Sequence, residues 1–253
     1  MFPFERREKI LKKLQTDGKI NINSNYKKLK VSKSTLHRDL TELEKEGIVI
    51  KVRGGAILPE ISRFETHFDI RMKTHVKEKK EIAQKAVEFI LDDSSIFLDH
   101  SSTAVFVAKE IREHSFRNLL VLTNSLVVPE VLFNKKGIKV MLTGGLVENE
   151  FKALSGGWVI DSFKKLNIHQ IFISVGAVSF EKGLMTQIPF IYEILPEIIK
   201  NARQVNVLVD TSKFFKIGTF QIIPITSSLN FFTDNNCPKE VRKKLENIGV
   251  KVF

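Results

Sequence analysis

The feature that most constrains this chain is an amphipathic segment near its amino terminus, VSKSTLHRDLTELEKEG at residues 31–47. Leu36, Leu40 and Leu43 recur at positions i, i+4 and i+7 of a helix, so they form one apolar stripe. Ser32 precedes the stripe, where a hydroxyl side chain can cap the first turn. The sequence therefore predicts a helix that buries its leucines against a small core.

The opposite face of this predicted helix carries side chains that can hydrogen-bond to DNA. Ser34, Arg38 and Thr41 lie on that face, and His37 flanks them. Hydroxyl, guanidinium and imidazole groups can all reach phosphates or base edges in a major groove. The alternative is an ordinary solvated surface helix, which isolated segments of this pattern more often form.

The neighbouring segments favour a DNA-binding domain. Apolar residues predict a first helix over residues 5–16 and a short second helix over residues 23–29. After the third helix comes IVIKVRGGAIL, in which β-branched and basic residues surround Gly54 and Gly55, the signal of a hairpin. Together these elements predict a winged helix-turn-helix domain over residues 1–58.

Charge agrees with this interpretation. Residues 1–60 hold 14 Lys and Arg against 8 Asp and Glu, in a chain whose formal net charge is +11. Such an excess is expected where a domain meets a polyanion, although lysine-rich compositions also follow genome composition. We expect phosphate contacts from Arg7 and the other basic residues and base or phosphate contacts from the third helix. The residues predicted to contact DNA are Arg6, Lys33, Ser34, Thr35, His37, Arg38, Thr41, Lys51 and Arg53.

A different pattern begins after residue 76. Residues 59–76 have no sustained period and predict a linker, and KEKKEIAQKAVEFI at residues 77–90 predicts a helix. Short apolar runs then alternate with helical segments, which is typical of a mostly parallel sheet covered by helices. The predicted strands are SIFLD, NLLVLT, IKVML, QIFISV, VNVLVD, LNFFTD and VKVF. The sequence thus predicts a larger α/β domain over residues 77–253.

Polar residues follow five of these predicted strands, at the carboxyl ends where parallel sheets bind ligands. Ser102 and Thr103 also begin a predicted helix, so hydroxyls and free backbone N–H groups would form an anion site there. Taken singly, each residue has an ordinary explanation in a turn or a cap. The polar strand ends are Asp99 to Thr103, Thr123 to Ser125, Gly144 with Gly145, Gly176, and Asp210 with Ser212 and Lys213.

Two sets of motifs resemble the DeoR family of bacterial transcriptional repressors, over nearly the whole chain. VSKSTLHRDLTELEKEGIVIKVRGGA resembles the family signature V-S-x-x-T-[IL]-R-R-D-L, followed by L-x-x-x-G and a basic hairpin that ends G-G-A. Here His37 replaces the first of the paired arginines, while Arg38 and Asp39 are kept. This departure concerns the operator preference that the resemblance implies, and not the fold.

The second half resembles the family's sensor domain, which is similar in fold to phosphosugar isomerases. DHSST at residues 99–103 matches the phosphate loop D-x-G-[ST]-T except at Ser101, while TNS, TGG and D-x-S-K match as they stand. Ala177 and Ser179 replace the usual Gly and Asp, and Leu195 and Pro196 replace the Lys and Arg of E-A-E-V-K-R, which implies an altered or weakened pocket. The resemblance implies a phosphorylated sugar as effector. The residues it implies for that site are Asp99, Ser101, Ser102, Thr103, Asn124, Gly144, Gly176, Glu193, Asp210 and Lys213.

Several other features narrow the expectations. Cys237 is the single cysteine, which excludes an internal disulfide, and we find no signal peptide or apolar stretch that could span a membrane, so we expect a cytoplasmic protein. The six histidines have no spacing typical of a metal site, and no cofactor is expected. His100 is expected to be a loop residue, and Trp158 to pack a helix against the sheet.

The sequence therefore predicts a repressor of sugar-metabolism genes that binds double-stranded operator DNA as a homo-oligomer and responds to a phosphorylated sugar. A single winged helix-turn-helix domain contacts too few base pairs for useful specificity, and this favours a homo-oligomer that binds paired half-sites. Two alternatives stay open. The first is a DNA binder that has lost effector sensing, and the second is a phosphosugar isomerase with a DNA-binding appendage, in which Asp99, Glu193, Asp210 and Lys213 would transfer protons.

Overall fold

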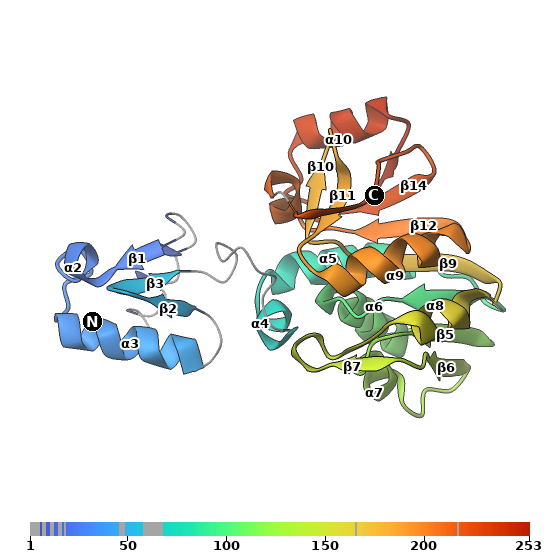
Figure 1. Cartoon of the computed structure of the whole chain (residues 1–253), viewed down its shortest axis with the longest axis horizontal. Helices are drawn as coiled ribbons and strands as arrows, with labels where there is room; N and C mark the ends of the chain where they lie inside the picture. The colour runs from blue at the N-terminus through green and yellow to red at the C-terminus, as the bar shows by residue number, and fades with distance from the viewer. Residues whose placement is uncertain are drawn as a thin grey trace. The chain divides into compact units, whose positions relative to one another are not determined.

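The computed structural model describes residues 6, 9–10, 13–14, 17, 19–45, 49–57, 68–164, 166–216 and 218–253. The chain divides into two compact units, Met1–Thr74 and His75–Phe253, and Figure 1 labels many of their helices and strands. Across the residues that the structure describes, every helix is too short or too polar to span a lipid bilayer.

The amino-terminal unit is built on helix α3 (Lys33–Lys45). The predicted stripe is confirmed, because Leu36, Leu40 and Leu43 are all buried in one cluster, which also contains Ile10 and Leu14. The last two residues belong to the predicted first helix, of which the structure describes only part as helical, and the remainder, including Leu11, lies outside the described residues.

Two smaller elements of this unit differ from the prediction. The second helix is α2 (Ile22–Asn25), shorter than the predicted 23–29, and a turn carries the chain from there to α3. Asn21 directly precedes α2 and is its N-cap, because the Asn21 side chain accepts a hydrogen bond from the backbone N–H of Asn23 (2.9 Å). Asn side chains favour caps of this kind.

The predicted hairpin is confirmed and is joined by a third strand that was not predicted. Strands β2 (Ile50–Val52) and β3 (Gly55–Ile57) pair antiparallel, and β1 (Lys19–Asn21) pairs with the other side of β3. β1 has three residues, too few to show a period, which is why the sequence gave no signal for it. This three-stranded sheet forms the wing.

The segment predicted as a linker includes a helix. Residues 68–73 form α4 (Phe68–Lys73), in which Phe68 is buried, while residues 59–67 lie outside the described residues. Six residues are fewer than two helical turns, so their periodicity could not be recognised in the sequence.

The second unit contains, among its described residues, a parallel sheet of seven strands in the order β15-β14-β12-β9-β4-β5-β6. All seven predicted strands are confirmed, and each neighbouring pair is parallel. The fold class, a winged helix-turn-helix followed by a parallel α/β domain, is confirmed. The strands are β4 (Ser95–Leu98), β5 (Leu119–Thr123), β6 (Ile138–Leu142), β9 (Ile168–Ile173), β12 (Ala202–Leu208), β14 (Leu229–Phe232) and β15 (Lys251–Val252).

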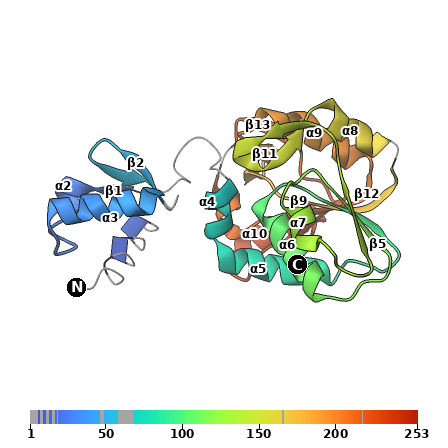
Figure 2. The ribbon, with the colours of Figure 1, turned by 90° about the horizontal axis from the view of Figure 1, so that it is seen from below.

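Helices cover both faces of this sheet, and Figure 2 shows α8 and α9 on one side and α5 and α6 on the other. The predicted helix over residues 77–90 is α5, which begins one residue earlier and ends three residues sooner. The helices of the unit are α5 (Val76–Val87), α6 (Ser102–Glu113), α7 (Val128–Leu132), α8 (Gly157–Lys164), α9 (Pro189–Lys200) and α10 (Lys239–Asn247).

Two antiparallel elements accompany the sheet and were not predicted. β7 (Leu146–Glu148) pairs with β8 (Ala153–Ser155), with a short 3₁₀ turn, η2 (Asn149–Phe151), between them. A separate three-stranded sheet is made of β10 (Ala177–Ser179), β11 (Gly183–Thr186) and β13 (Phe220–Ile223). Their strands have three or four residues, too few to show a period in the sequence.

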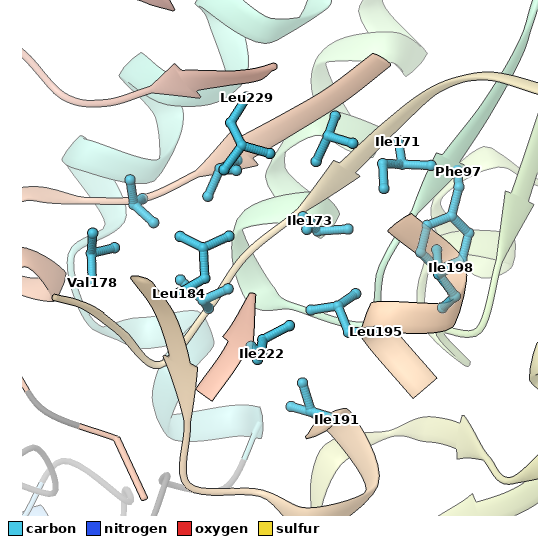
Figure 3. Close-up of a cluster of buried hydrophobic side chains, with 14 of the residues drawn as sticks. Phe97, Ile171, Ile173, Val178, Leu184, Ile191, Leu195, Ile198, Ile222 and Leu229 are labelled. Atoms are coloured by element: carbon cyan, nitrogen blue, oxygen red, sulfur yellow. The ribbon is translucent and has the colours of Figure 1, made fainter. Parts of the chain in front are cut away.

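The small sheet shares the core of the parallel sheet. Val178, Leu184 and Ile222 from the small sheet belong to the same buried cluster as Phe97 and Ile171 from the large one. Figure 3 shows these side chains converging with Ile191, Leu195 and Ile198 of α9. Because α9 packs against both sheets, it holds them as one body within this unit.

Gly55 provides a test of the wing. A Cβ atom at this position would lie 1.9 Å from the backbone oxygen of Ile20 in β1, so only glycine allows the strands to approach. We expect Gly55→Ala to reduce the stability of the amino-terminal unit by about 1–3 kcal/mol. In Gly157→Ala, the matched control, the new methyl group meets nothing within 4 Å. Calorimetry of the full chain would measure both, and equal stability of the two variants would contradict the proposed crowding.

Candidate functional sites

The outer face of α3 is the first candidate site. Ser34, His37 and Arg38 are exposed, whereas Leu36 and Leu40 on the other face are buried. Ser32 caps the helix as predicted, because its hydroxyl accepts a hydrogen bond from the backbone N–H of Thr35 (3.0 Å). The helix therefore presents hydroxyl, imidazole and guanidinium groups from a rigid support.

Arg6 does not belong to this exposed surface, which corrects the prediction of a phosphate contact. The residue is 8% exposed, and its guanidinium donates two hydrogen bonds to the carboxylate of Asp39, one of them 2.8 Å long. This pairing raises the pKa of Arg6 above its ordinary value. The pair joins the first helical segment to α3, so Arg6 supports the orientation of the helix and is removed from the DNA-contact set.

Lys51 joins the wing to α3. Its ammonium group donates a hydrogen bond to the hydroxyl of Thr41 (3.1 Å), and its backbone N–H donates to the carboxylate of Glu44 (3.2 Å). Lys51 and Thr41 are both partly buried, so these two predicted DNA contacts meet each other at the junction. Arg53, at the turn between β2 and β3, is exposed, as is Lys33, whose ammonium lies 5.3 Å from the ring centre of Tyr26.

The second candidate site is at the carboxyl ends of the parallel strands. The five predicted polar strand ends follow β12, β9, β4, β5 and β6, which are five consecutive strands of the sheet. Chain order reverses between β4 and β9, because β5 and β6 continue on one side of β4 while β9, β12 and β14 continue on the other. In open α/β sheets such a reversal creates a crevice for ligands. We call this region the crevice.

Asp99 holds the two sides of the reversal together. It follows β4 and is buried, and its carboxylate accepts hydrogen bonds from the backbone N–H groups of Ser101 (2.9 Å) and Ser174 (2.8 Å). Ser174 lies directly after β9, so one side chain fixes both loops. The sequence did not single out Ser174, since its contribution is a backbone N–H group.

Ser101 caps α6, at the position where the resemblance implied glycine. Its hydroxyl accepts a hydrogen bond from the backbone N–H of Ala104 (3.1 Å), and its φ of −68° is ordinary for a residue with a side chain. Ser102 and Thr103 are buried in the first turn of the same helix. The side chain of Ser101 is therefore accommodated by capping.

Asn124 offers the crevice an unused acceptor. Its Nδ2 donates to the carbonyl of Leu154 (2.9 Å), whereas its Oδ1, which is buried, has no hydrogen-bond partner within the described part of the chain. The neighbouring Thr123 donates to the carbonyl of Leu98 (2.7 Å) and accepts from the N–H of Ser125 (3.0 Å). These bonds fix the loop, and they leave a buried oxygen that requires a donor.

A narrow pocket of about 10 Å³, the space of a single water molecule, lies beside Asn124. Its polar wall contains Asp99, His100 and Asn124, so His100 lines a pocket where the sequence predicted only a loop residue. The other wall is apolar and comes mainly from α9. The apolar residues are Phe97, Ile191, Ile194, Leu195 and Ile198.

Glu193 is not part of that wall. It lies on the exposed face of α9, opposite Leu195 and Ile191, because two helical positions separate side chains by about 200°. The structure therefore does not bring Glu193 to the pocket, and it is removed from the predicted effector set. The segment aligned with E-A-E-V-K-R instead presents Leu195, which is buried and aliphatic.

Asp210 and Lys213 lie at the end of β12. Asp210 is buried and accepts hydrogen bonds from the backbone N–H and hydroxyl of Ser212. Burial alone would raise its pKa, but the positive charges of Lys213, His75 and Lys79 and the Ser212 bond together hold the pKa of Asp210 below its ordinary value. Lys213 is partly exposed in the 3₁₀ helix η3 (Thr211–Phe215).

Gly144 and Gly145 follow β6 and border Trp158. A Cβ on Gly144 would lie 3.2 Å from the indole ring, and Gly145 has a φ of +142° with a Ser155 oxygen 2.5 Å from any added Cβ. Packing thus explains both glycines without a ligand. Trp158 itself is 73% exposed, so the prediction that it packs a helix against the sheet is wrong.

Gly176 lies after β9 and is partly exposed. Within the described residues, no cluster of three His, Cys, Asp or Glu side chains is arranged to hold a metal ion. The crevice thus offers hydroxyls, a helix N-terminus, one free amide oxygen and one lysine.

Comparison with known proteins identifies both units. The sequence model of the DeoR-like helix-turn-helix domain matches residues 6–62, and that of the DeoR C terminal sensor domain matches residues 74–235. The HTH-type transcriptional regulator GolR of Listeria innocua is 32% identical over 100% of this chain and 98% of its own length. The HTH-type transcriptional repressor GlcR of Bacillus subtilis is 31% identical over 100% and 96%. Among solved structures, ribose 5-phosphate isomerase from Plasmodium falciparum aligns with a TM-score of 0.40 at 17% identity, over 56% of this chain and 54% of its own.

The Arg6–Asp39 pair generates a prediction. We expect Arg6→Ala to destabilise the amino-terminal unit by about 3 kcal/mol, because it leaves the buried carboxylate of Asp39 unpaired. The double variant Arg6→Ala/Asp39→Ala should recover part of the loss, since neither partner is then left alone. Calorimetry of the full chain provides the measurement. A single variant as stable as the parent would show that the pair does not hold the helices.

Proposed function

The chain belongs to the DeoR family of transcriptional regulators, and on this basis we propose that it represses transcription by binding double-stranded operator DNA through α3. Its relatives of known name are regulators and not enzymes, so the isomerase alternative is set aside. The observation that carries the proposal is the division of α3 into a buried leucine face and an exposed face of Ser34, His37 and Arg38.

In this proposal α3 enters the major groove and the wing contacts the backbone. Arg38 lies at the centre of the exposed face, where a guanidinium can bond two atoms of a guanine edge. Lys33 and Arg53 are exposed and cationic, which suits phosphate contacts that position the unit without reading sequence. The main role of Lys51 and Thr41 in this proposal is to hold the wing against α3 through their hydrogen bond.

We further propose that the protein works as a homo-oligomer in the cytoplasm. A single winged helix reads a few base pairs, and two symmetric copies double that number and fix the spacing of half-sites. The single cysteine agrees with a reducing compartment.

The crevice is proposed to hold a phosphorylated sugar. The first turn of α6 offers backbone N–H groups with the hydroxyls of Ser102 and Thr103, which suits a phosphate. The Oδ1 of Asn124 lacks a donor among the described residues, and a sugar hydroxyl would supply one. Lys213 follows β12, which is two strands from β4 and therefore about 10 Å away at the strand ends, within reach of a ligand that spans both.

Asp210 offers a route from the crevice to the DNA-binding unit. Its charge interacts with Lys213 at the crevice and also with His75 and Lys79 at the start of α5, where the chain arrives from residues 1–74. A phosphate that draws Lys213 away would alter the balance of charge around the first turn of α5. Coupling of about 1–3 kcal/mol between such sites gives roughly 5–150-fold regulation.

The alternative is a DNA binder that no longer senses a sugar phosphate. The observation that favours it is the apolar wall of the pocket, in which Leu195 occupies a position where the resemblance implied a cation. A phosphate beside that wall would lack a counter-charge.

Arg38 tests the DNA-binding proposal. We expect Arg38→Ala to weaken operator binding by about 1–3 kcal/mol while leaving thermal stability unchanged, because the side chain is exposed. Lys243→Ala, which removes an equal charge from an exposed position on α10, is the matched control. Fluorescence anisotropy on selected operator and scrambled duplexes would measure both. If the Arg38 variant bound the operator as tightly as the parent does, the proposed placement of α3 in the major groove would be contradicted.

Lys213 tests the effector proposal. We expect at least one phosphorylated pentose, hexose or triose to raise the melting temperature of the parent, and its unphosphorylated form to have no effect. Lys213→Ala should abolish this shift, and Lys243→Ala should retain it. If all sugar phosphates fail in calorimetric titration, the effector-blind alternative replaces this proposal.

A further inference from the structure

A second buried carboxylate, that of Asp234, follows the strand next to β12. Asp210 and Asp234 each lie two positions after the last residue of a strand, and the two strands are the parallel neighbours β12 and β14. Their last residues, Leu208 and Phe232, are paired in register. The two aspartates therefore occupy equivalent positions on adjacent strands, and Asp234 is completely buried.

The carboxylate of Asp234 holds the start of η3. One of its oxygens accepts a hydrogen bond from the backbone N–H of Thr211 (2.6 Å). The other oxygen accepts from the hydroxyl of Thr211 (3.0 Å) and from the backbone N–H of Asn236 (3.0 Å). Three donors satisfy a buried charge that would be costly without them. These bonds fix Thr211, the first residue of η3, to the end of β14.

Lys213 lies two residues farther along η3. The backbone N–H of Ser212 donates to the carboxylate of Asp210 (3.0 Å), and the backbone N–H of Lys213 donates to the carbonyl of Asp210 (3.0 Å). The first three residues of η3 are thus anchored in succession, one to β14 and two to β12. A lysine ammonium is carried on a flexible stem, so a fixed backbone limits the region that it can reach.

The loop that follows β14 is also bonded to α5. We call this loop, residues 233–236, the brace. The ammonium group of Lys85 donates to the carbonyl of Thr233 (2.8 Å), and the backbone N–H of Asn235 donates to the carboxylate of Glu81 (3.0 Å). Glu81 and Lys85 are four positions apart, so they lie on one face of α5. The brace therefore contacts both η3 and α5.

We propose that Asp234 is a positioning residue for the effector: it holds Lys213 where the ammonium group can contact the phosphate, and through the brace it links that contact to α5. This inference rests on the proposed function, because it requires a phosphorylated sugar in the crevice. Asp234 is buried and its oxygens are bonded to three donors, so it acts on the ligand through η3.

The link to α5 gives this contact a regulatory consequence. α5 is the first helix of the second unit, directly after the point where the chain leaves the amino-terminal unit. A displacement of η3 that accompanies phosphate binding would pull on the brace, whose buried hydrogen bonds are costly to break. We therefore expect α5 to respond to the ligand through these bonds as well as through the charges around Asp210.

Calorimetric titration of the full chain tests the positioning role, with ribose 5-phosphate, glucose 6-phosphate and dihydroxyacetone phosphate as probes. We expect Asp234→Asn to weaken binding about tenfold, because the amide keeps the size of the side chain but turns one acceptor toward a donor of η3 or the brace. Thr211→Val should weaken binding by about threefold, since it loses only the hydroxyl bond. Thr211→Ser keeps the hydroxyl and should bind as the parent does.

Asp92→Asn is the matched control. Its carboxylate also accepts a backbone N–H, that of Arg117 (2.8 Å), but both residues precede their strands and lie at the amino edge of the sheet. This variant should keep the parent affinity. Hydrogen exchange without ligand would show whether the effect of Asp234→Asn is local. The amides of residues 211–213 should exchange faster and those of β4 and β9 at the parent rate, whereas faster exchange throughout the unit would overturn the positioning role.

The link to α5 has a separate test. Glu81→Ala/Lys85→Met should keep sugar-phosphate affinity within about twofold, because neither side chain contacts η3, but should reduce the effect of the ligand on operator affinity at least about threefold. Lys80→Met/Gln84→Ala, at two exposed positions of the same helix, is the control. Fluorescence anisotropy with and without the sugar phosphate measures this effect. Regulation equal to that of the parent in Glu81→Ala/Lys85→Met would overturn the link.

The outcomes separate this inference from the proposed function. If none of the three sugar phosphates binds the parent, the proposed effector fails. If one of them binds the parent, and Asp234→Asn and Thr211→Val bind it equally tightly, the effector stands and only the positioning role of Asp234 is wrong. If Asp234→Asn does not fold, the contrast between Thr211→Val and Thr211→Ser decides, and equal affinity of these two variants would overturn the proposal.

Discussion

The carboxylate of Asp99 is the contact on which the carboxyl edge of the sheet depends. Chain order reverses between β4 and β9, so the loops that follow them separate and leave a crevice. Asp99 accepts backbone hydrogen bonds from Ser101 on one side and Ser174 on the other. A buried charge must be satisfied in this way, and satisfying it fixes the start of α6 relative to β9. The hydroxyls of Ser102 and Thr103 are then held in place.

Those parts of the fold that depend on local periodicity could be predicted from the sequence. Leu36, Leu40 and Leu43 mark α3 because a helix repeats every 3.6 residues, and the inner strands of the parallel sheet are apolar because both of their faces are covered. Both signals are strong because each extends over several residues of one element. The polar residues at the strand ends could also be predicted, since the carboxyl ends of parallel strands share one edge of the sheet. The distances between these residues could not be predicted.

The features that could not be predicted arise from contacts between distant segments. Arg6 looked like a phosphate contact because its charge is visible in the sequence, but Asp39, 33 residues away, is not visible as its partner. Glu193 matches a glutamate of the motif E-A-E-V-K-R, but its position on α9 places the side chain on the exposed face of the helix. Trp158 is large and apolar, so packing against the sheet was the natural expectation, yet its side chain is 73% exposed beside Gly144. The type of a residue therefore does not determine whether its side chain is exposed, because burial also depends on segments that are distant in the sequence.

The loop after β6 connects these observations. Gly145 needs its positive φ to pass the backbone of Ser155, so the loop has little freedom to change shape without moving α8, in which Trp158 lies. On the opposite flank of the crevice, Asp210 interacts with the start of α5, where the chain arrives from the winged helix. A ligand in the crevice would therefore lie between the loop that supports α8 and the charges at the start of α5. Both flanks are tightly packed or hold buried charged groups, and packed elements of this kind shift as units, so we expect a displacement at either flank to move α8 or α5.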